Sequence, residues 1–326
     1  MAIDTTIMGE KNLLAYSAGI DSSALFYLLI EHGVKFDIAI VNYQTRDASD
    51  IEEHHAIEIA RRYGIECYHT RAPEFDTHFE RNAREFRYQF FEDIIQKHSY
   101  DTLITAHQLN DQLEWMLMRL TKGAGVSELV GLKTISQRAG YTLIRPLLSY
   151  AKHELLEYLQ SNEYSYFIDE SNSDQKYERN RFRSRFADPL MEKYTDGIRR
   201  SFEYMTQDKR ELESRFETVY SSHRLRVIRL QSRLYKTKAT DMILKELGYL
   251  MSGAQRSEVY LKESLVIGGK WAVEIQDELL YIAPYTTEPI PKKDKERYRV
   301  ARVPVKIRSY CYQNSIDIED IICQRL

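Results

Sequence analysis

The chain has 326 residues, of which 43% are hydrophobic and 29% charged, and its formal net charge is −3. This composition is typical of a globular protein with room for two domains, and it excludes a polycationic chain. No apolar run approaches the roughly 20 residues that span a bilayer, and no leader peptide is visible. Because Cys67, Cys311 and Cys323 form no C-x-x-C pair, we expect no zinc ribbon or disulfide scaffold, and a cytoplasmic protein without membrane contact.

The first half of the sequence alternates short apolar segments with longer segments of helical periodicity. We predict strands at residues 12–16, 36–42, 65–70 and 102–106, and helices at residues 22–32, 50–63, 79–98 and 110–121. This alternation predicts an α/β fold, a Rossmann-like, mostly parallel sheet with helices on both faces. Ligands of such sheets bind at the carboxyl ends of the strands.

The pattern changes after residue 202, where a long charged helix is predicted to reach about residue 220. Shorter helices at 239–247 and 254–265 and a hairpin at 268–283 follow. We place a domain boundary near residue 215, between a domain of residues 1–215 and a smaller α+β domain of residues 216–326. Basic clusters at 224–238 and 292–308 suit either a surface that binds a polyanion or ordinary solvated faces.

The most specific motif follows the first predicted strand and comprises Ser17, Ala18, Gly19, Ile20, Asp21 and Ser22. A strand, a loop of small residues and a helix direct backbone N–H groups and a helix N-terminus at an anion. The carboxylate of Asp21 repels phosphate unless Mg²⁺ lies between them, so Asp21 is a candidate metal ligand. A plain strand-to-helix turn with a Ser or Asp cap is the alternative.

A second cluster begins at His107, after the fourth predicted strand. On a helix, Asn110 and Glu114 share a face and Asp111 lies beside them. Acids at this position either complement the helix dipole or hold an amine or a metal ion at a pocket rim. Asn42 ends the second predicted strand, where it is a candidate for adenine or ribose contact or an ordinary turn residue.

Two segments carry candidate arginines. Arg84 and Arg87 lie one turn apart on a predicted helix, where they either bind a carboxylate or phosphate or form surface salt bridges. The run from Arg179 to Arg185 is too rich in cations for a buried helix face. It favours contact with phosphate or with an RNA backbone.

In their order and spacing, these motifs resemble those of bacterial tRNA(Ile)-lysidine synthetases, which are ATP pyrophosphatases of the PP-loop type. The resemblance covers about the first 190 residues and is carried by residues 17–22, 82–88, 106–114, 119–125, 145–148, 169–172 and 179–181. It implies that ATP adenylates the wobble cytidine in the CAU anticodon of tRNA(Ile), and that L-lysine then displaces AMP to form lysidine. A PP-loop tRNA thiolase, which usually needs paired cysteines, and a non-catalytic tRNA-binding protein are the alternatives.

The resemblance also implies roles for single residues. The loop of residues 17–22 would hold pyrophosphate, with Mg²⁺ on Asp21 and with Asn42 and His107 as further nucleotide contacts. Asp111 and Glu114 would receive the ammonium groups of lysine, and Arg87 its carboxylate. The sequence departs from the family at Ala18, which replaces a glycine, at Asn110, which replaces an acid, and at Trp115, which replaces a threonine. The oligomeric state is not predicted.

Overall fold

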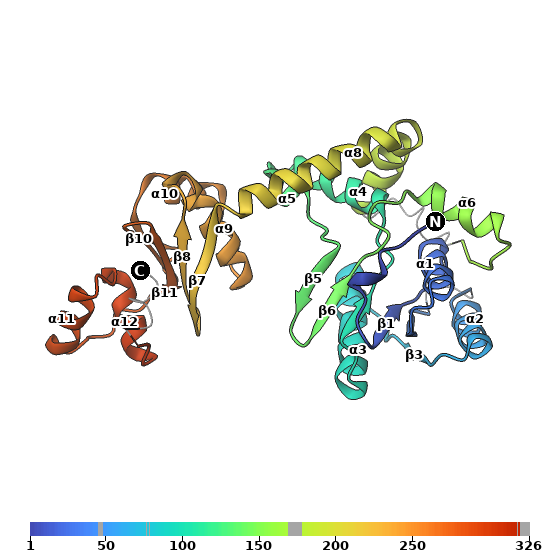
Figure 1. Cartoon of the computed structure of the whole chain (residues 1–326), viewed down its shortest axis with the longest axis horizontal. Coiled ribbons are helices and arrows are strands. Elements are labelled where there is room, and N and C mark those ends of the chain that lie inside the picture. Colours follow the sequence, from blue (N-terminus) through green and yellow to red (C-terminus); the bar gives the residue numbers. More distant parts are fainter. Residues whose placement is uncertain (45–47, 76, 78, 169–177, 318, 320–326) are drawn as a thin grey trace. The chain divides into compact units, whose positions relative to one another are not determined.

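The computed structural model describes residues 1–44, 48–75, 77, 79–168, 178–317 and 319 (Figure 1). The chain divides into two compact units, Met1–Gln207 and Asp208–Leu326. This division lies within helix α8 (Asp188–Glu213), whereas the boundary predicted near residue 215 lies just after that helix. No described helix is both long and apolar enough to cross a bilayer.

The first unit contains a six-stranded sheet in the order β3-β2-β1-β4-β6-β5. Its strands are β1 (Asn12–Ala15), β2 (Phe36–Asn42), β3 (Cys67–Arg71), β4 (Thr102–Ile104), β5 (Ile135–Arg138) and β6 (Tyr141–Ile144). Strand β5 pairs antiparallel with β6, and the other pairings are parallel. The predicted α/β fold with a mostly parallel sheet is therefore confirmed, although the short β5–β6 hairpin was not anticipated.

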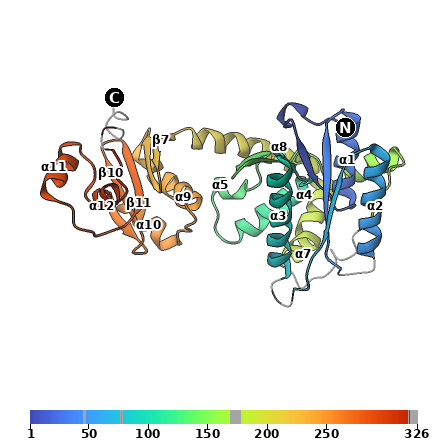
Figure 2. The same cartoon turned by 90° about the horizontal axis from the view of Figure 1, so that it is seen from below.

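Helices cover both faces of this sheet, because neighbouring residues of its central strands point to opposite sides. Leu14 packs with α1 (Ile20–Glu31), α2 (Ala48–Tyr63) and α6 (Lys152–Ser161), while Leu13 packs with α3 (Phe79–His98). Figure 2 shows α1 and α2 on one side of the strands and α3 on the other. Both leucines are fully buried, which explains the continuous apolar sequence of β1.

The order of the strands places the two main candidate motifs together. Strand β1 pairs with β2 on one side and with β4 on the other, so the direction of winding reverses between β1 and β4. Ligand crevices form at such a reversal, outside the carboxyl ends of the strands. The loop at Ser17 follows β1, and helix α4 (Leu109–Leu120) follows β4.

The end of the first unit packs against α4. Helix α7 (Glu178–Phe182), the π-helical turn η3 (Arg183–Ala187) and helix α8 succeed one another. Ala187 and Met191 share a buried cluster with Leu109 and Leu113 of α4. Because π-helical turns are frequent at functional sites, the arginines of η3, beside α4, are candidates for a functional role. The first unit also contains η1 (Thr5–Ile7) and α5 (Val126–Leu129).

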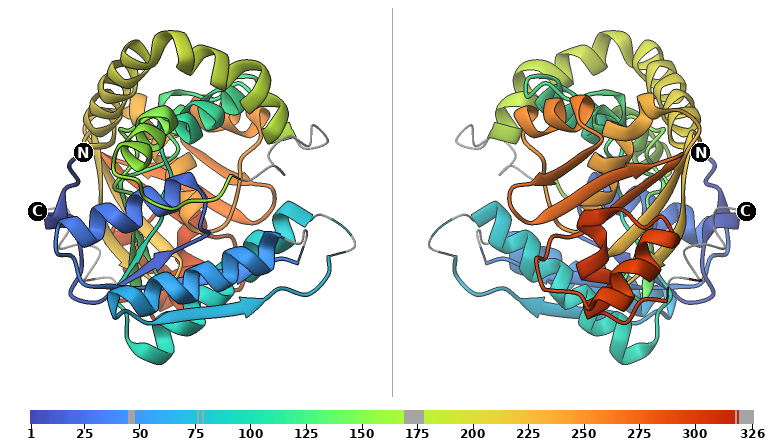
Figure 3. Two further views of the ribbon diagram at one scale, coloured as in Figure 1. Left: turned by 90° about the vertical axis from the view of Figure 1, so that its right-hand side faces the viewer. Right: turned by 90° about the vertical axis from the view of Figure 1, so that its left-hand side faces the viewer.

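The second unit contains an antiparallel sheet in the order β7-β8-β11-β10-β9. Its strands are β7 (Phe216–Ser222), β8 (Leu225–Leu230), β9 (Ser264–Ile267), β10 (Trp271–Gln276) and β11 (Leu279–Pro284), and its helical segments are η4 (Arg233–Tyr235), α9 (Lys236–Glu246), α10 (Gly253–Leu261), α11 (Lys292–Val300) and α12 (Val305–Gln313). The helices α9 and α10 cover one face, while α11 and α12 cover the other, as the right-hand view of Figure 3 shows.

The predicted hairpin is β10–β11, which is confirmed. Two predicted helices extend too far. Residues 216–220 belong to strand β7, because Phe216, Val219 and Tyr220 favour a pleated surface, and residues 264–265 belong to strand β9.

Candidate active site

The loop after β1 is a compact turn closed by its own hydroxyl groups. Ser17 N–H donates to Ser22 Oγ at 3.2 Å, and Ser22 Oγ donates to the carbonyl of Gly19 at 3.2 Å. Helix α1 begins at Ile20, two positions earlier than predicted, so Asp21 and Ser22 lie in its first turn. Among the described residues, a Cβ added to Gly19 would come within 4 Å of Ser17 Oγ alone, at 3.6 Å, so this backbone is not crowded. The geometry suits an anion at a helix N-terminus.

Ala18 adopts a left-handed backbone conformation, with φ of 58°. Its carbonyl accepts Phe167 N–H at 2.9 Å and Ser23 Oγ at 3.1 Å, which fixes the turn from two sides. A glycine adopts this conformation without strain, whereas an L-residue pays about 1–2 kcal/mol. The turn therefore tolerates alanine at position 18, because hydrogen bonds on both sides hold its backbone in this strained conformation.

Asp21 carries a buried carboxylate oxygen, Oδ1, that has no hydrogen-bond partner among the described residues. Burial raises the pKa of Asp21 to about 7, and the charge of Asp111 adds to the shift, while Lys152, Arg183 and Gln108 oppose it. A buried carboxylate whose pKa stays raised despite these neighbouring cations fits a site for a further cation. Mg²⁺ suits it, because this ion binds one or two carboxylates together with substrate phosphates.

The start of α4 is held by a capping box. Gln108 Oε1 accepts Asn110 N–H, and Oδ2 of Asp111 accepts Gln108 N–H at 3.0 Å. His107 Nδ1 lies 3.0 Å from Thr105 Oγ1. Burial lowers the pKa of His107, with help from the charges of Arg145, Arg179 and Arg87, so its imidazole is neutral at neutral pH. One oxygen of Asp111, Oδ2, therefore caps the helix N-terminus, as the structural alternative for these acids predicted.

The other oxygens of the acid pair contact two arginines. Arg179 donates to Asp111 Oδ1 at 2.5 Å and to Glu114 Oε2 at 2.8 Å, and Arg183 Nε donates to Glu114 Oε1 at 2.5 Å. The carboxyl side chains are 11% and 1% exposed. Although burial opposes ionisation, Arg179, His107 and Gln108 N–H hold the pKa of Asp111 below its usual value. Arg179 and Arg183 therefore contact carboxylates in this structure, and their predicted contact with phosphate or an RNA backbone stays a prediction.

Arg87 and Asn42 have different surroundings. Arg87 is half-buried and close enough to influence the pKa of His107 and of Tyr43, so it lies on the same side of the sheet edge as the acid pair. Arg84 instead stacks over the ring of Tyr88, 4.8 Å from its centroid.

The side chain of Asn42 is buried and satisfied internally. Its Nδ2 donates to Asp50 and Glu53 at 2.7 Å each, and its Oδ1 accepts Gln44 N–H at 2.8 Å. These bonds suit a turn residue, and nucleotide contact by Asn42 stays a prediction. Residues 45–47 beyond it, the motif at 169–172 and Cys323 lie outside the described residues.

The departures at Asn110 and Trp115 have structural partners. Asn110 Nδ2 donates to Asp188 at 3.3 Å and its Oδ1 accepts Lys152 N–H at 3.2 Å, which joins α4 to α8 and α6. An aspartate at position 110 would face the carboxylate of Asp188. Trp115 Nε1 donates to the carbonyl of Glu128 at 2.8 Å. These hydrogen-bond partners of Asn110 and Trp115 lie outside the acid pair, so neither side chain takes over the role of Asp111 or Glu114.

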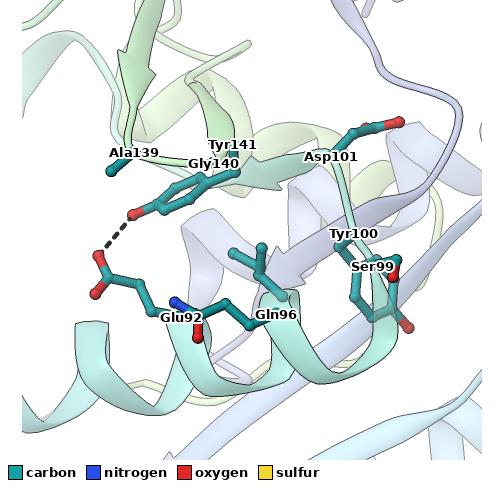
Figure 4. Close-up of a pocket in the computed structure, with 9 residues that line it drawn as sticks. Glu92, Gln96, Ser99, Tyr100, Asp101, Ala139, Gly140 and Tyr141 are labelled. Carbon is teal, nitrogen blue, oxygen red and sulfur yellow. Dashed lines mark hydrogen bonds between the residues drawn. The ribbon is translucent and has the colours of Figure 1, made fainter.

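A separate cavity of about 310 Å³ lies near the opposite ends of the strands, between the end of α3 and the β5–β6 turn (Figure 4). Its carboxylates are engaged: Glu92 accepts the hydroxyl of Tyr141 at 3.1 Å, and Asp101 accepts Glu10 N–H and Lys11 N–H. We assign no chemistry to it.

Sequence reasoning missed several residues around the site. Lys152 and Arg183 influence Asp21 although they lie more than a hundred residues away in sequence, and Thr105 orients His107. The arginine run was noticed, but its partners were not. Acids on α4 and arginines on α7 and η3 are far apart in the chain, so a single sequence does not show that they pair.

The fold and the loop define a PP-loop nucleotide-binding protein, and the PP-loop domain family matches residues 4–190. The chain is 41% identical to a tRNA(Ile)-lysidine synthase from Campylobacter jejuni, over 95% of each sequence. Relatives with the same name from Wolinella succinogenes and Helicobacter pylori are each 39% identical, over 94% and 93% of this chain and 94% and 89% of their own length. The chain therefore belongs to the tRNA(Ile)-lysidine synthase family and is an enzyme. The thiolase alternative is not favoured.

Proposed function

We propose that this enzyme acts on tRNA(Ile) with a CAU anticodon, in the cytoplasm, and joins L-lysine to its wobble cytidine. The observation that carries the proposal is the match to tRNA(Ile)-lysidine synthases over almost the whole of both sequences. The C2 oxygen of cytidine attacks the α-phosphate of ATP, and pyrophosphate leaves. The ε-amine of lysine then attacks C2, AMP leaves with that oxygen, and the amine loses a proton.

In this proposal the loop of residues 17–22 binds the phosphates of ATP through backbone N–H groups and the hydroxyls of Ser17 and Ser22. Asp21 supplies the ligand for Mg²⁺, which would neutralise charge on the phosphates. The uncrowded backbone at Gly19 and the oxygen of Asp21 that has no partner among the described residues support these roles. Neutral His107, at the end of the neighbouring strand, contacts the nucleotide as a hydrogen-bonding group rather than as a cation.

The acid pair Asp111 and Glu114 takes the ammonium groups of lysine, and Arg87 takes its carboxylate. Two carboxylates and one guanidinium complement a substrate with two ammonium groups and one carboxylate. A carboxylate near the attacking amine can also accept its proton. Positioning of the amine and of the adenylated base then supplies most of the rate enhancement.

We assign tRNA binding to the predicted C-terminal domain, residues 216–326, which lies within the second unit, through contacts with phosphate. The two basic clusters, residues 224–238 and 292–308, differ in how well they support this assignment. Arg224 lies over Trp271 and donates to the carbonyl of Leu247, while Arg229 and Arg233 pair with Glu217 and Glu263. The exposed lysines that begin α11, which are Lys292, Lys293 and Lys295, are better candidates.

The test is incubation with an isoleucine tRNA transcript bearing CAU, with ATP, Mg²⁺ and labelled lysine. We expect lysine-dependent label on the tRNA and release of AMP, both lost when the wobble cytidine is changed to uridine. AMP release that needs a sulfur donor in place of lysine, or no ATP turnover at all, would overturn the proposal.

A further inference from the structure

The acid pair is already neutralised within the chain. Two carboxylates, Asp111 and Glu114, face two guanidiniums, Arg179 and Arg183, and the four groups sum to zero charge. Each of the four carboxylate oxygens accepts a donor: three from the arginines and one from Gln108 N–H. The pair is largely removed from solvent, with Glu114 only 1% exposed.

A lysine ammonium offers the same kind of donor as these guanidiniums. If it entered beside both arginines, the cluster would gain uncompensated positive charge in a buried site, which is unfavourable. Exchange of one arginine for the ammonium keeps the charge balanced. Lysine and at least one arginine therefore compete for the same oxygens.

Each arginine has a further anionic neighbour besides the acid pair: Glu80 for Arg179 and Asp21 for Arg183. Only the neighbour of Arg183 lies in the loop proposed to hold the phosphates, where the charge of Arg183 opposes the rise in the pKa of Asp21. Arg183 also belongs to the π-helical turn η3, a rare helical form that is often found at functional sites. Its guanidinium thus contacts the acid pair and is close enough to influence the carboxyl of Asp21 in the phosphate loop.

We propose that Arg183 is a positioning residue that exchanges partners: it occupies the acid pair until the phosphates of ATP or of the adenylated base attract it, and its release opens the lysine site. This inference rests on the proposed function. Phosphates add negative charge beside Asp21, to which a guanidinium binds in fork geometry. Nucleotide binding therefore raises the affinity for lysine, and by reciprocity lysine raises the affinity for nucleotide.

The experiment measures lysine binding to the full chain by calorimetry, with and without Mg²⁺ and α,β-methylene ATP, which cannot be cleaved between the α and β phosphates. For the parent protein we expect the dissociation constant of lysine to fall about 5- to 150-fold when the nucleotide is present. For Arg183→Gln we expect tighter lysine binding without nucleotide and a coupling factor close to 1.

Two further variants make the test specific. Arg183→Lys keeps the charge but loses the fork, so its coupling should lie between those of the parent and of Arg183→Gln. Arg185→Gln removes an exposed arginine of the same turn and should couple as the parent does. Equal lysine affinity of the parent with and without nucleotide would overturn the inference even if Arg183→Gln failed to fold, and so would undiminished coupling in Arg183→Gln.

The failure of this inference differs from failure of the proposed function. If the parent labels the CAU tRNA with lysine but shows no coupling, only the partner exchange is wrong. If the parent binds no lysine under any condition and labels no tRNA, the proposed function is wrong and the exchange falls with it.

Discussion

The two acidic centres of the first unit are both buried, yet their charges are compensated very differently. Oδ1 of Asp21 finds no donor in the described part of the chain, and burial raises the pKa of this carboxyl to about 7. Asp111 and Glu114 accept donors on every oxygen, and the pKa of Asp111 is held low. Asp21, whose pKa is raised, can bind a cation that a ligand brings. The pair Asp111 and Glu114 is already neutralised, so it must release an arginine before it can bind another cation.

The sharpest test of the uncompensated centre is Asp21→Asn. This change keeps the shape but removes the charge that would bind Mg²⁺, so we expect ATP-dependent labelling of tRNA by lysine to fall at least about 100-fold. The matched control is Asp196→Asn, on an 81% exposed side chain of α8, which should retain the parent rate. Near-normal activity of Asp21→Asn would show that this carboxylate takes no part in ATP use.

The compensated centre is tested by Glu114→Gln. Loss of this charge leaves two guanidiniums opposite one carboxylate in a buried site, and we expect the free energy of unfolding to fall by about 3 kcal/mol in urea denaturation. Glu85→Gln is the control, because Glu85 forms an exposed pair with Arg81 at 2.8 Å and should change stability by less than about 1 kcal/mol. Equal losses of unfolding free energy in the two variants would mean that the buried cluster stabilises the fold no more than an exposed ion pair does.

The two centres also predict a difference in pH dependence. The folded-state pKa of Asp21 lies above the unfolded value, so the folded chain binds the extra proton between about pH 4 and pH 7 and loses stability as pH rises through that window. The stability of Asp21→Asn relative to the parent should therefore grow from pH 4 to pH 7 by about 4 kcal/mol and then level off. Urea denaturation of both proteins at each pH measures it. A flat difference would contradict the raised pKa.

The smallest expected effect is that of Ala18→Gly. Relief of left-handed strain is worth about 1–2 kcal/mol, but the added freedom of the unfolded chain costs about 0.4–1 kcal/mol and loss of a buried methyl about 0.8 kcal/mol. These terms nearly cancel, so we expect a change in stability below about 0.5 kcal/mol and unchanged activity. Ala24→Gly, a fully buried helical position of α1, lacks the strain and should lose about 1.5 kcal/mol. Thermal unfolding compares them; equal losses would show that Ala18 is not strained.

Features that arise from local pattern were predictable from the sequence. A largely apolar segment located β2 to the residue, because burial in a parallel sheet leaves a strong signal, and helical periodicity located α3 to the residue. The short hairpin β5–β6 lacked that signal, since three of the four residues of β5 are exposed. The prediction assigned most of β7 to the charged helix before it, because an edge strand also carries charged residues and so resembles an exposed helix in sequence.

In the site, residue types were predictable and their partners were not. The loop at residues 17–22 and the acids of α4 stood out because their chemistry is local. Arg179 meets Glu114 across 65 positions of sequence, and nothing local distinguishes it from an arginine that faces solvent. The clusters of residues 224–238 show the same limit: a run of cations in one dimension contains Arg229 and Arg233, which pair with acids on other elements.

The bond from Phe167 N–H to the carbonyl of Ala18 has a consequence for how this enzyme can be divided. Phe167 also forms a parallel bridge with Gly19, so the turn after β1 is made of two segments drawn from distant parts of the chain. A fragment that ends after the six-stranded sheet would keep the loop of residues 17–22 but would lose the hydrogen bond from Phe167 that holds it. Any minimal catalytic fragment, split enzyme or circular permutant must therefore retain the stretch around Phe167 in the same folded body.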